Sequence, residues 1–392
     1  MKTIYIFLII ALTWFLVYIL GRMLKLEEKY NWTITPLFIL IRTKWFNNFL
    51  KKIAKKYARF WRLMGNISIF VGFISMFLAI GLLLFTLIDF FLPNPTVSSE
   101  GPAIGLIIPG VTISFKTFLY LIIPLILSVF PHEFAHGVVS HADGVELKST
   151  GLAFFAIFFG AFVEPDEEDI MNSSAKTKMR TFASGMFPNV ILGLITIPLF
   201  IFAPNIIAPF YLPPDGILIM EVVEESPAAI AGLERGFVIF DINNTHISTS
   251  AVFSEYMMKT QPNQTLQMNT SDGNYNAKLD ASPANESIGY LGIYTIQYQE
   301  PKFGSVGKFF PYHFNQQLMW LLVVSFGSVL FNALPIPFLL DGDKLLSAFL
   351  SQYIRNQKVA YIILDVFRYL AIILFLANII LPILKYGIVP IG

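Results

Sequence analysis

Six apolar segments dominate this chain, and each approaches the length that a helix needs to cross a bilayer. A spanning helix takes about 20 mostly apolar residues. Only 14% of the 392 residues are charged, whereas soluble domains carry about 25%. The pattern predicts a polytopic α-helical membrane protein with about six transmembrane helices, at residues 3–20, 66–92, 115–140, 181–204, 315–338 and 359–384.

Basic residues give the predicted orientation of these helices. Residues 21–65 contain eleven Lys and Arg against two Glu, which places this segment on the cytoplasmic side by the positive-inside rule. Its second half is typical of a basic, aromatic-rich amphipathic helix that rests on anionic lipid. Residues 3–20 then form an anchor with an outside N-terminus. A signal peptide is the weaker alternative, because no small-residue cleavage site follows.

The third apolar segment carries the run His132-Glu133-Phe134-Ala135-His136. Histidines four residues apart share one face of a helix, where both imidazoles can bind one Zn²⁺. Glu133 lies beside the first histidine and is a candidate general base toward a zinc-activated water. So short a motif also occurs by chance. Inside a membrane segment, however, ionisable residues are expensive and are candidates for function.

A catalytic zinc takes three protein ligands and leaves one position open. The sequence contains no cysteine and five histidines, so the third ligand must be a histidine or a carboxylate. Asp341 follows the proline-broken end of the fifth segment. Because the third and fifth segments both run inward, Asp341 and His136 fall at similar depth near the cytoplasmic side. Two asparagines, Asn189 and Asn332, lie on the neighbouring segments.

Residues 141–163 begin with a turn at His141 to Gly144, and the apolar stretch that follows is broken by Gly151 and Gly160. At about 14 residues this stretch is too short for another spanning helix and suits a re-entrant membrane element that lines a wet cavity. The acidic residues that follow, from Glu164 to Asp169, are predicted to be a solvated surface; a metal site is the less favoured alternative.

Residues 211–300 are polar and alternating, unlike the rest of the chain. The order of their expected elements resembles that of a PDZ domain. A first strand is followed by Ser226-Pro227-Ala228, then by a glycine turn, and then by a second strand that ends before Asn243-Asn244. Phe237 stands where that family usually has Asp, and Asn244 where it usually has Gly. The resemblance implies peptide binding by strand addition, with a groove at Gly289, Tyr290, Leu291 and Gly292. The crossing count and four glycosylation-type sequons place this domain outside the cell.

The membrane motifs together resemble the site-2 protease family of intramembrane zinc metalloproteases. That family combines H-E-x-x-H, G-x-x-x-N and N-x-x-P-x-P followed by L-D-G. The matching residues here are His132 to His136, Gly185 to Asn189, and Asn332 through Pro335 to Leu340-Asp341-Gly342. Many members have eight residues from the Asn to the Asp, whereas this chain has nine.

The resemblance implies one Zn²⁺ per chain, held by His132, His136 and Asp341, with Glu133 as catalytic base. It also implies that Asn189 and Asn332 contact the substrate or the developing oxyanion, and that Gly185, Pro335 and Gly342 support the site. It implies cleavage of transmembrane segments in regulated intramembrane proteolysis, in the plasma membrane, with the active site toward the cytoplasm. The expected partners are transmembrane proteins and lipid, with no nucleic acid; the sequence does not indicate an oligomeric state.

The expected organisation has four parts. Residues 1–114 hold the N-terminal helices and the basic segment, 115–210 the first part of the catalytic core, 211–300 the PDZ-like domain, and 301–392 the second part of the core and the last helix. Two alternatives remain: a non-catalytic membrane-anchored PDZ tether, and a zinc protease whose third ligand is a Glu on a later helix. No suitable apolar helix carries such a Glu.

Overall fold

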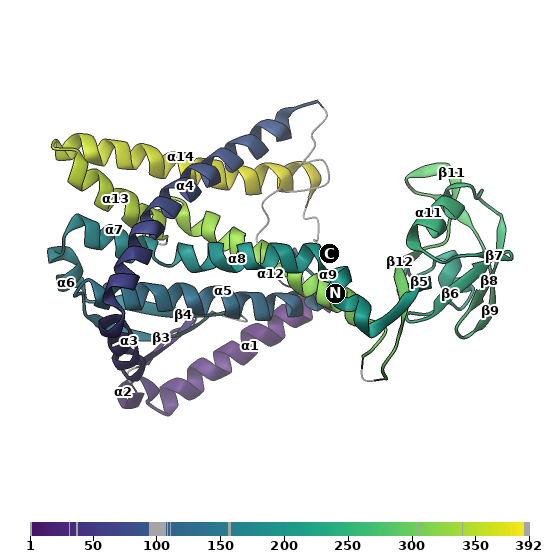
Figure 1. Ribbon diagram of the computed structural model, residues 1–392, viewed down its shortest axis with the longest axis horizontal. Helices are drawn as coiled ribbons and strands as arrows, with labels where there is room; N and C mark the ends of the chain where they lie inside the picture. The colour runs from purple at the N-terminus through teal and green to yellow at the C-terminus, as the bar shows by residue number, and fades with distance from the viewer. Residues whose placement is uncertain are drawn as a thin grey trace. The chain divides into compact units, whose positions relative to one another are not determined.

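The computed structural model describes residues 2–30, 32–36, 38–93, 107, 109, 111–155, 158–304, 306–338 and 340–387. The expected loop at 93–114 lies largely outside these residues. The chain forms two compact units, one of Met1–Pro198 with Gln317–Gly392 and the other of Leu199–Gln316 (Figure 1).

Five helical stretches of the described chain are long and apolar enough to cross a membrane. The first expected span forms helix α1 (Lys2–Met23), in which the apolar part, Leu8–Met23, is shorter than the other five. The five are α4 (Ala58–Phe91), α5 (Phe115–Ala142), α7 (Ala175–Ala183) with α8 (Met186–Ile201), α12 (Phe310–Ala333) and α14 (Gln357–Tyr386).

A core of apolar side chains joins these helices around α13 (Asp341–Tyr353), which lies between α12 and α14 in the chain. Leu346 and Leu350 of α13 pack with Met76 of α4, Met186 of α8 and Val329 of α12. Helix α13 is amphipathic rather than apolar throughout. Its buried face therefore fixes the position of its first turn, which begins at Asp341.

The segment expected to be re-entrant forms an antiparallel hairpin of β3 (Leu147–Phe155) and β4 (Phe158–Pro165). Two strands from the N-terminal basic segment extend it, β1 (Thr33–Ile34) and β2 (Phe38–Thr43). The sheet order is β1-β2-β3-β4, so β4 lies at one edge. The sequence analysis did not predict β1 and β2.

The expected amphipathic helix is α3 (Trp45–Lys56), which ends just before α4. Its buried residues, Leu50 and Ala54, pack against Val138 and Ala142 of α5. A large part of the apolar side of α3 is thus covered by the protein itself, while its lysine-rich side is exposed. The short helices α2 (Leu26–Tyr30) and α6 (Glu167–Asn172) complete this unit.

The second unit contains a sheet in the order β12-β5-β6-β8-β9, with β7 paired to β6 and a separate β10–β11 pair. Ser226 caps α10, and Asn243 and Asn244 turn the chain at positive φ. Asn tolerates this conformation better than most residues, which explains Asn244 in place of Gly. Phe237 packs on the apolar core. The elements are α9 (Ala203–Ile207), a 3₁₀ turn (Ala208–Phe210), β5 (Tyr211–Val222), α10 (Pro227–Ile230), β6 (Val238–Ile242), β7 (Thr245–His246), α11 (Ser250–Met258), β8 (Thr265–Thr270), β9 (Gly273–Lys278), β10 (Asp280–Ser282), β11 (Asn285–Tyr290) and β12 (Ile293–Pro301).

Candidate active site

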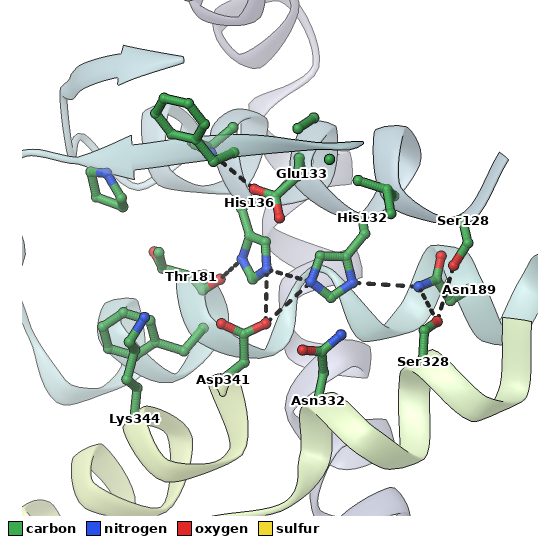
Figure 2. A pocket seen from close by; sticks show the side chains of 17 residues that line it. Ser128, His132, Glu133, His136, Thr181, Asn189, Ser328, Asn332, Asp341 and Lys344 are labelled. Atoms are coloured by element: carbon green, nitrogen blue, oxygen red, sulfur yellow. Dashed lines mark hydrogen bonds and ion pairs between the residues drawn. The ribbon is translucent and has the colours of Figure 1, made fainter. Parts of the chain in front are cut away.

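Two histidines of α5 and one aspartate of α13 meet at a single point (Figure 2). His132 Nε2 lies 3.1 Å from His136 Nε2. Asp341 Oδ2 lies 3.2 Å from the first nitrogen and 3.1 Å from the second. The structure thus brings together the three residues that the sequence proposed as ligands, across 205 residues of chain between His136 and Asp341.

Close backbone packing places Asp341. A Cβ at Gly342 would collide with the carbonyl oxygen of Ala333, so glycine lets the start of α13 lie against the end of α12. Pro335, which follows α12 in the chain, is buried. In the following loop Phe338 is fully exposed, at 100%, and has a positive φ of 63°. The interval from Asn332 to Asp341 is one residue longer than the eight found in many members of the family named above, and we assign the additional residue to this loop. Leu339, in the same loop, is not among the described residues.

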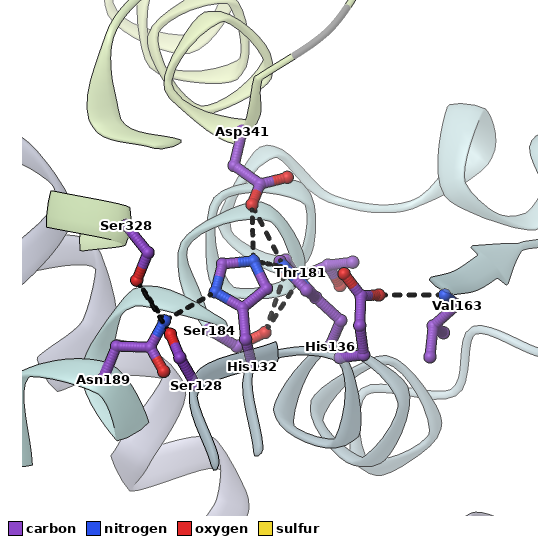
Figure 3. Close-up of polar contacts among 10 residues, drawn as sticks. Ser128, His132, His136, Val163, Thr181, Ser184, Asn189, Ser328 and Asp341 are labelled. Carbon is purple, nitrogen blue, oxygen red and sulfur yellow. Dashed lines mark hydrogen bonds and ion pairs between the residues drawn. The ribbon is translucent and has the colours of Figure 1, made fainter. Parts of the chain in front are cut away.

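A backbone carbonyl orients His136. Its Nδ1 donates to Thr181 O at 2.6 Å, and Ser184 Oγ lies 3.3 Å from the same nitrogen (Figure 3). In a neutral imidazole this leaves the Nε2 lone pair directed at Asp341 and His132.

Arg180, the residue before Thr181, makes two hydrogen bonds to Asp143 at 3.0 and 3.1 Å. This ion pair fixes α7 to the end of α5.

Asn189 stands behind His132 rather than beside Asp341. Its Nδ2 lies 3.4 Å from His132 Nδ1 and donates to Ser328 Oγ at 2.8 Å. The side chain is 1% exposed and its Oδ1 has no hydrogen-bond partner. A half-turn of the amide directs Oδ1 at His132 Nδ1, so that the imidazole donates there and presents the Nε2 lone pair to the site.

Glu133 lies on the other side of the histidines, facing the sheet. Its Oε2 accepts a hydrogen bond from the backbone nitrogen of Val163 in β4 at 2.9 Å. Figure 2 shows the other carboxylate oxygen pointing back toward the imidazoles. The contact fixes Glu133 between the metal-ligand triangle and the edge strand.

The donor set fits a zinc ion. In a tetrahedral site with Zn–N bonds of about 2.0–2.1 Å, ligand atoms lie about 3.3 Å apart, close to the distances above. The two Nε2 atoms and Asp341 Oδ2 converge on one point, where both nitrogens can bind one zinc ion when each imidazole is neutral and protonated at Nδ1. Gly185 leaves room: a Cβ there would lie 2.5 Å from Nε2 of both His132 and His136.

A cavity of about 390 Å³ opens beside the triangle. Its wall is polar around Ser128, Ser328 and Asn332, and includes Gly160 to Val163 of β4. Asn332 makes no side-chain hydrogen bond within the described part of the chain, so its amide is available. Lys344 lines the cavity on the side away from Ser328 (Figure 2). Phe182, whose ring lies under the Lys344 ammonium, is also a lining residue.

A model of peptidase family M50 matches residues 120–374. This chain belongs to that family. Membership in M50, the site-2 protease family, identifies a membrane metalloprotease, and with the five long apolar helices it makes the chain an integral membrane protein.

Two kinds of similar protein accompany the M50 match. An uncharacterized protein of Methanocaldococcus jannaschii is 26% identical over 369 residues, which cover 92% of this chain and 90% of that protein. Crystal structures of the PDZ domains of two SdrC-like proteins are each similar to 21% of this chain. The domain from Listeria monocytogenes is 26% identical, with 88% of its length covered and a TM-score of 0.19. The domain from Listeria innocua is 23% identical, with 93% of its length covered and a TM-score of 0.19.

Two other expectations for this M50 chain concern residues away from the triangle. Residues Gly289 to Gly292 run from β11 into the turn before β12, where the carbonyls of Leu291 and Gly292 accept bonds from Ala228 N and Val223 N. Glu164 pairs with Lys148, and Asp166 caps α6. Outside the cavity, Arg368 pairs with Asp365 at 3.2 Å.

Several contacts of the M50 site had no signal in the sequence. The carbonyl of Thr181 and the amide of Val163 are backbone groups that any residue supplies. Asp343, an alternative to Asp341 in the same turn, makes two hydrogen bonds with Arg368, at 2.6 and 2.8 Å. Asp343 is therefore occupied and lies away from the histidines. Ser328 and Lys344 were also missed, and only their spacing from Asn332 and Asp341 on helices would have indicated them.

Proposed function

We propose that this M50 protein is an intramembrane zinc metalloendopeptidase that cleaves transmembrane segments of other proteins. The observation that carries the proposal is the triangle of His132 Nε2, His136 Nε2 and Asp341 Oδ2, with Glu133 beside it, within a unit of membrane-length helices. An ion pair alone would not require two histidine nitrogens to face each other.

One Zn²⁺ bound to His132, His136 and Asp341 would polarise water and the scissile carbonyl. Thr181 and Asn189 hold the two imidazoles in the orientation that binding requires. Gly185 keeps the centre clear.

Glu133 is the general base of the proposal. One carboxylate oxygen is held by Val163, so the other is directed at the site and takes a proton from the attacking water. The same oxygen then delivers the proton to the leaving amide nitrogen. Cleavage thus proceeds without a covalent enzyme intermediate.

The two asparagines have different roles in this proposal. Asn332 lines the cavity with an available amide and donates a hydrogen bond to the oxyanion that develops on the scissile carbonyl. Asn189 is buried behind His132 and acts on the ligand. Asn189 also lines the cavity, and in this proposal its main contact is with His132 rather than with the substrate.

A transmembrane helix must unwind before it can be cut, since its amides are hydrogen-bonded within the helix. Strand β4 lies at an edge of its sheet, and its residues Gly160 to Val163 line the cavity. An unwound substrate segment pairs with this edge, which satisfies its backbone groups.

The remaining parts of the proposal concern place and control. The basic segment lies on the cytoplasmic side of the plasma membrane by the positive-inside rule, which places the active site toward the cytoplasm and the PDZ-like domain outside. That domain excludes substrates with bulky external domains, so that cleavage follows an earlier cut in regulated intramembrane proteolysis.

The test is Glu133→Gln in the full chain, assayed in liposomes on a membrane-spanning substrate. We expect the variant to bind zinc as the wild type does but to lose most cleavage, on the order of a hundredfold or more. Cleavage at the wild-type rate would refute the mechanism. Purified protein without stoichiometric zinc would favour the non-catalytic tether, which the M50 match does not favour.

A further inference from the structure

Lys344 shares the cavity with the proposed metal site. It follows Asp341 by three residues on α13, a spacing that puts both side chains on one face of the helix. Both line the cavity of about 390 Å³, with Lys344 on the side away from Ser328 and Asn332 (Figure 2). The two ends of the cavity therefore differ: one is polar and neutral, and the other carries a cation.

An aromatic ring holds this cation in place. The Nζ atom of Lys344 lies 5.6 Å from the centroid of the Phe182 ring, and Phe182 also lines the cavity. A lysine over an aromatic ring gains a modest cation–π attraction. This contact fixes the ammonium at the cavity wall but leaves its hydrogen-bond donors free.

The carboxylates around the cavity are committed to other partners. Asp341 contacts two histidines, and Glu133 accepts from Val163. Glu164 pairs with Lys148, and Asp343 with Arg368. Within the described chain, no carboxylate pairs with Lys344. The lysine side chain is exposed, so water solvates it until a substrate segment enters the cavity.

Entry of a polypeptide changes the balance at Lys344. It displaces water from the ammonium, which is costly unless the incoming chain supplies a hydrogen-bonding anion. A carboxylate restores the lost interactions with a charge-assisted bond, whereas a neutral side chain does not. The geometry thus favours substrates that bring a negative charge to this end of the cavity.

We propose that Lys344 is a binding residue that recognises a carboxylate next to the scissile bond. The carboxylate comes either from an Asp or Glu side chain of the substrate or from the new C-terminus that cleavage creates. The proposal rests on the protease function proposed above. If the carboxylate is a side chain, cleavage is selective for charge along a mostly apolar substrate. If it is the new C-terminus, Lys344 binds the N-terminal product instead.

The test uses the full chain in liposomes and a set of membrane-spanning substrates. Each carries one Asp, or in the paired substrate one Asn, at successive positions on both sides of the scissile bond. The measured quantity is the ratio of kcat/KM for Asp over Asn at each position. In the wild type we expect a ratio of about tenfold at one position, in the range that a charged hydrogen bond contributes.

The variants are Lys344→Met, Lys344→Arg and Lys344→Glu. We expect the Asp/Asn ratio to fall to about one in Lys344→Met and to persist in Lys344→Arg. It should fall below one in Lys344→Glu, because the introduced carboxylate repels the Asp of the substrate. Lys358→Met, which removes an exposed lysine outside the cavity, is the matched control and keeps the wild-type ratio. Zinc content and thermal unfolding report whether each variant is folded.

A second measurement separates the two sources of the carboxylate. The N-terminal cleavage product is added as inhibitor, as free acid and as C-terminal amide. Stronger inhibition by the acid in the wild type but not in Lys344→Met assigns the contact to the new C-terminus; a side-chain ratio without this difference assigns it to Asp or Glu. Equal ratios in all variants, together with equal inhibition by acid and amide, overturn the proposal. Cleavage of the Asn substrates by the wild type still supports the protease function in that case, and its absence would refute that function instead.

Discussion

Gly185 lies so close to His132 that a methyl group on its Cα would come within 2.5 Å of the imidazole Nε2, and it would lie equally close to His136. The turn between α7 and α8 thus forms the floor of the proposed metal site.

Gly185→Ala should therefore prevent metal binding while the helices stay folded. The added methyl group occupies the space in which the two nitrogens converge. Zinc content of the purified variant, measured by atomic emission, checks this. Gly81→Ala is the matched control, because a Cβ there meets no atom within 4 Å. Stoichiometric zinc in Gly185→Ala would show that the ion does not lie between the histidines.

Removal of zinc by a chelator should lower the thermal stability of the whole membrane unit. A ligand present at a hundredfold excess over its Kd stabilises a protein by about 2.7 kcal/mol. Unfolding in detergent, followed with and without added Zn²⁺, measures the effect. Glu133→Gln should keep the zinc-dependent increase, because Glu133 is not a ligand, and Asp341→Asn should lose it. The reverse pattern would exchange the roles of these two acids.

Substitution of the two asparagines should change different quantities: zinc affinity for Asn189 and kcat for Asn332. Asn189→Leu should weaken zinc binding by about tenfold to a hundredfold, the usual effect of removing an orienting partner of a ligand. Asn332→Leu should leave zinc affinity near the wild-type value and lower kcat. Competition with a chromogenic chelator gives the affinities, and initial rates on the membrane substrate give kcat. If both variants changed only kcat, Asn189 would be a substrate contact after all.

Arg368 should be a large contributor to stability, although it lies outside the cavity. It makes two hydrogen bonds to Asp343, whose side chain is 8% exposed. Arg368→Met leaves that carboxylate buried and unpaired, which costs about 3–5 kcal/mol. The other partner of Arg368 is Asp365, whose side chain is 52% exposed. Asp365→Asn removes this charge and should lower the free energy of unfolding by less than about 1 kcal/mol. Thermal unfolding in detergent compares the two, and equal losses would contradict this account.

The PDZ-like domain should lose stability as pH rises. The hydrogen bond from His246 to Asp241, with a second to Asp215, raises the pKa of His246 above its usual value. The protonated pair therefore stabilises the fold fully below the unfolded pKa of roughly 6.5, and this stabilisation disappears as pH rises through the higher folded pKa. Hydrogen exchange of β6 and β7 in the full chain, corrected for intrinsic rates, measures it. His246→Gln should remove the pH dependence; an unchanged dependence would assign it to another group.

Local patterns gave the parts of the site that depend on spacing along a helix. His132 and His136 share a face because they are four residues apart, and Asp341 was indicated by the proline break before it. Contacts that join distant segments gave no such signal. Strand β2 is a short apolar run inside a basic segment, and its pairing with β3 depends on hydrogen bonds between residues about 110 positions apart, such as Arg42 and Gly151. The pairing of Asp343 with Arg368 is likewise a product of how α13 packs on α14.

The loop between Pro335 and Asp341 has a consequence for how this site can vary among proteins. Its two ends are fixed, one by the buried Pro335 and the other by Gly342 packed on the Ala333 carbonyl. Between them Phe338 is fully exposed. A residue can be inserted or deleted at this point while both ends remain in place, so the length of the sequence motif and the geometry of the metal ligands are free to change independently.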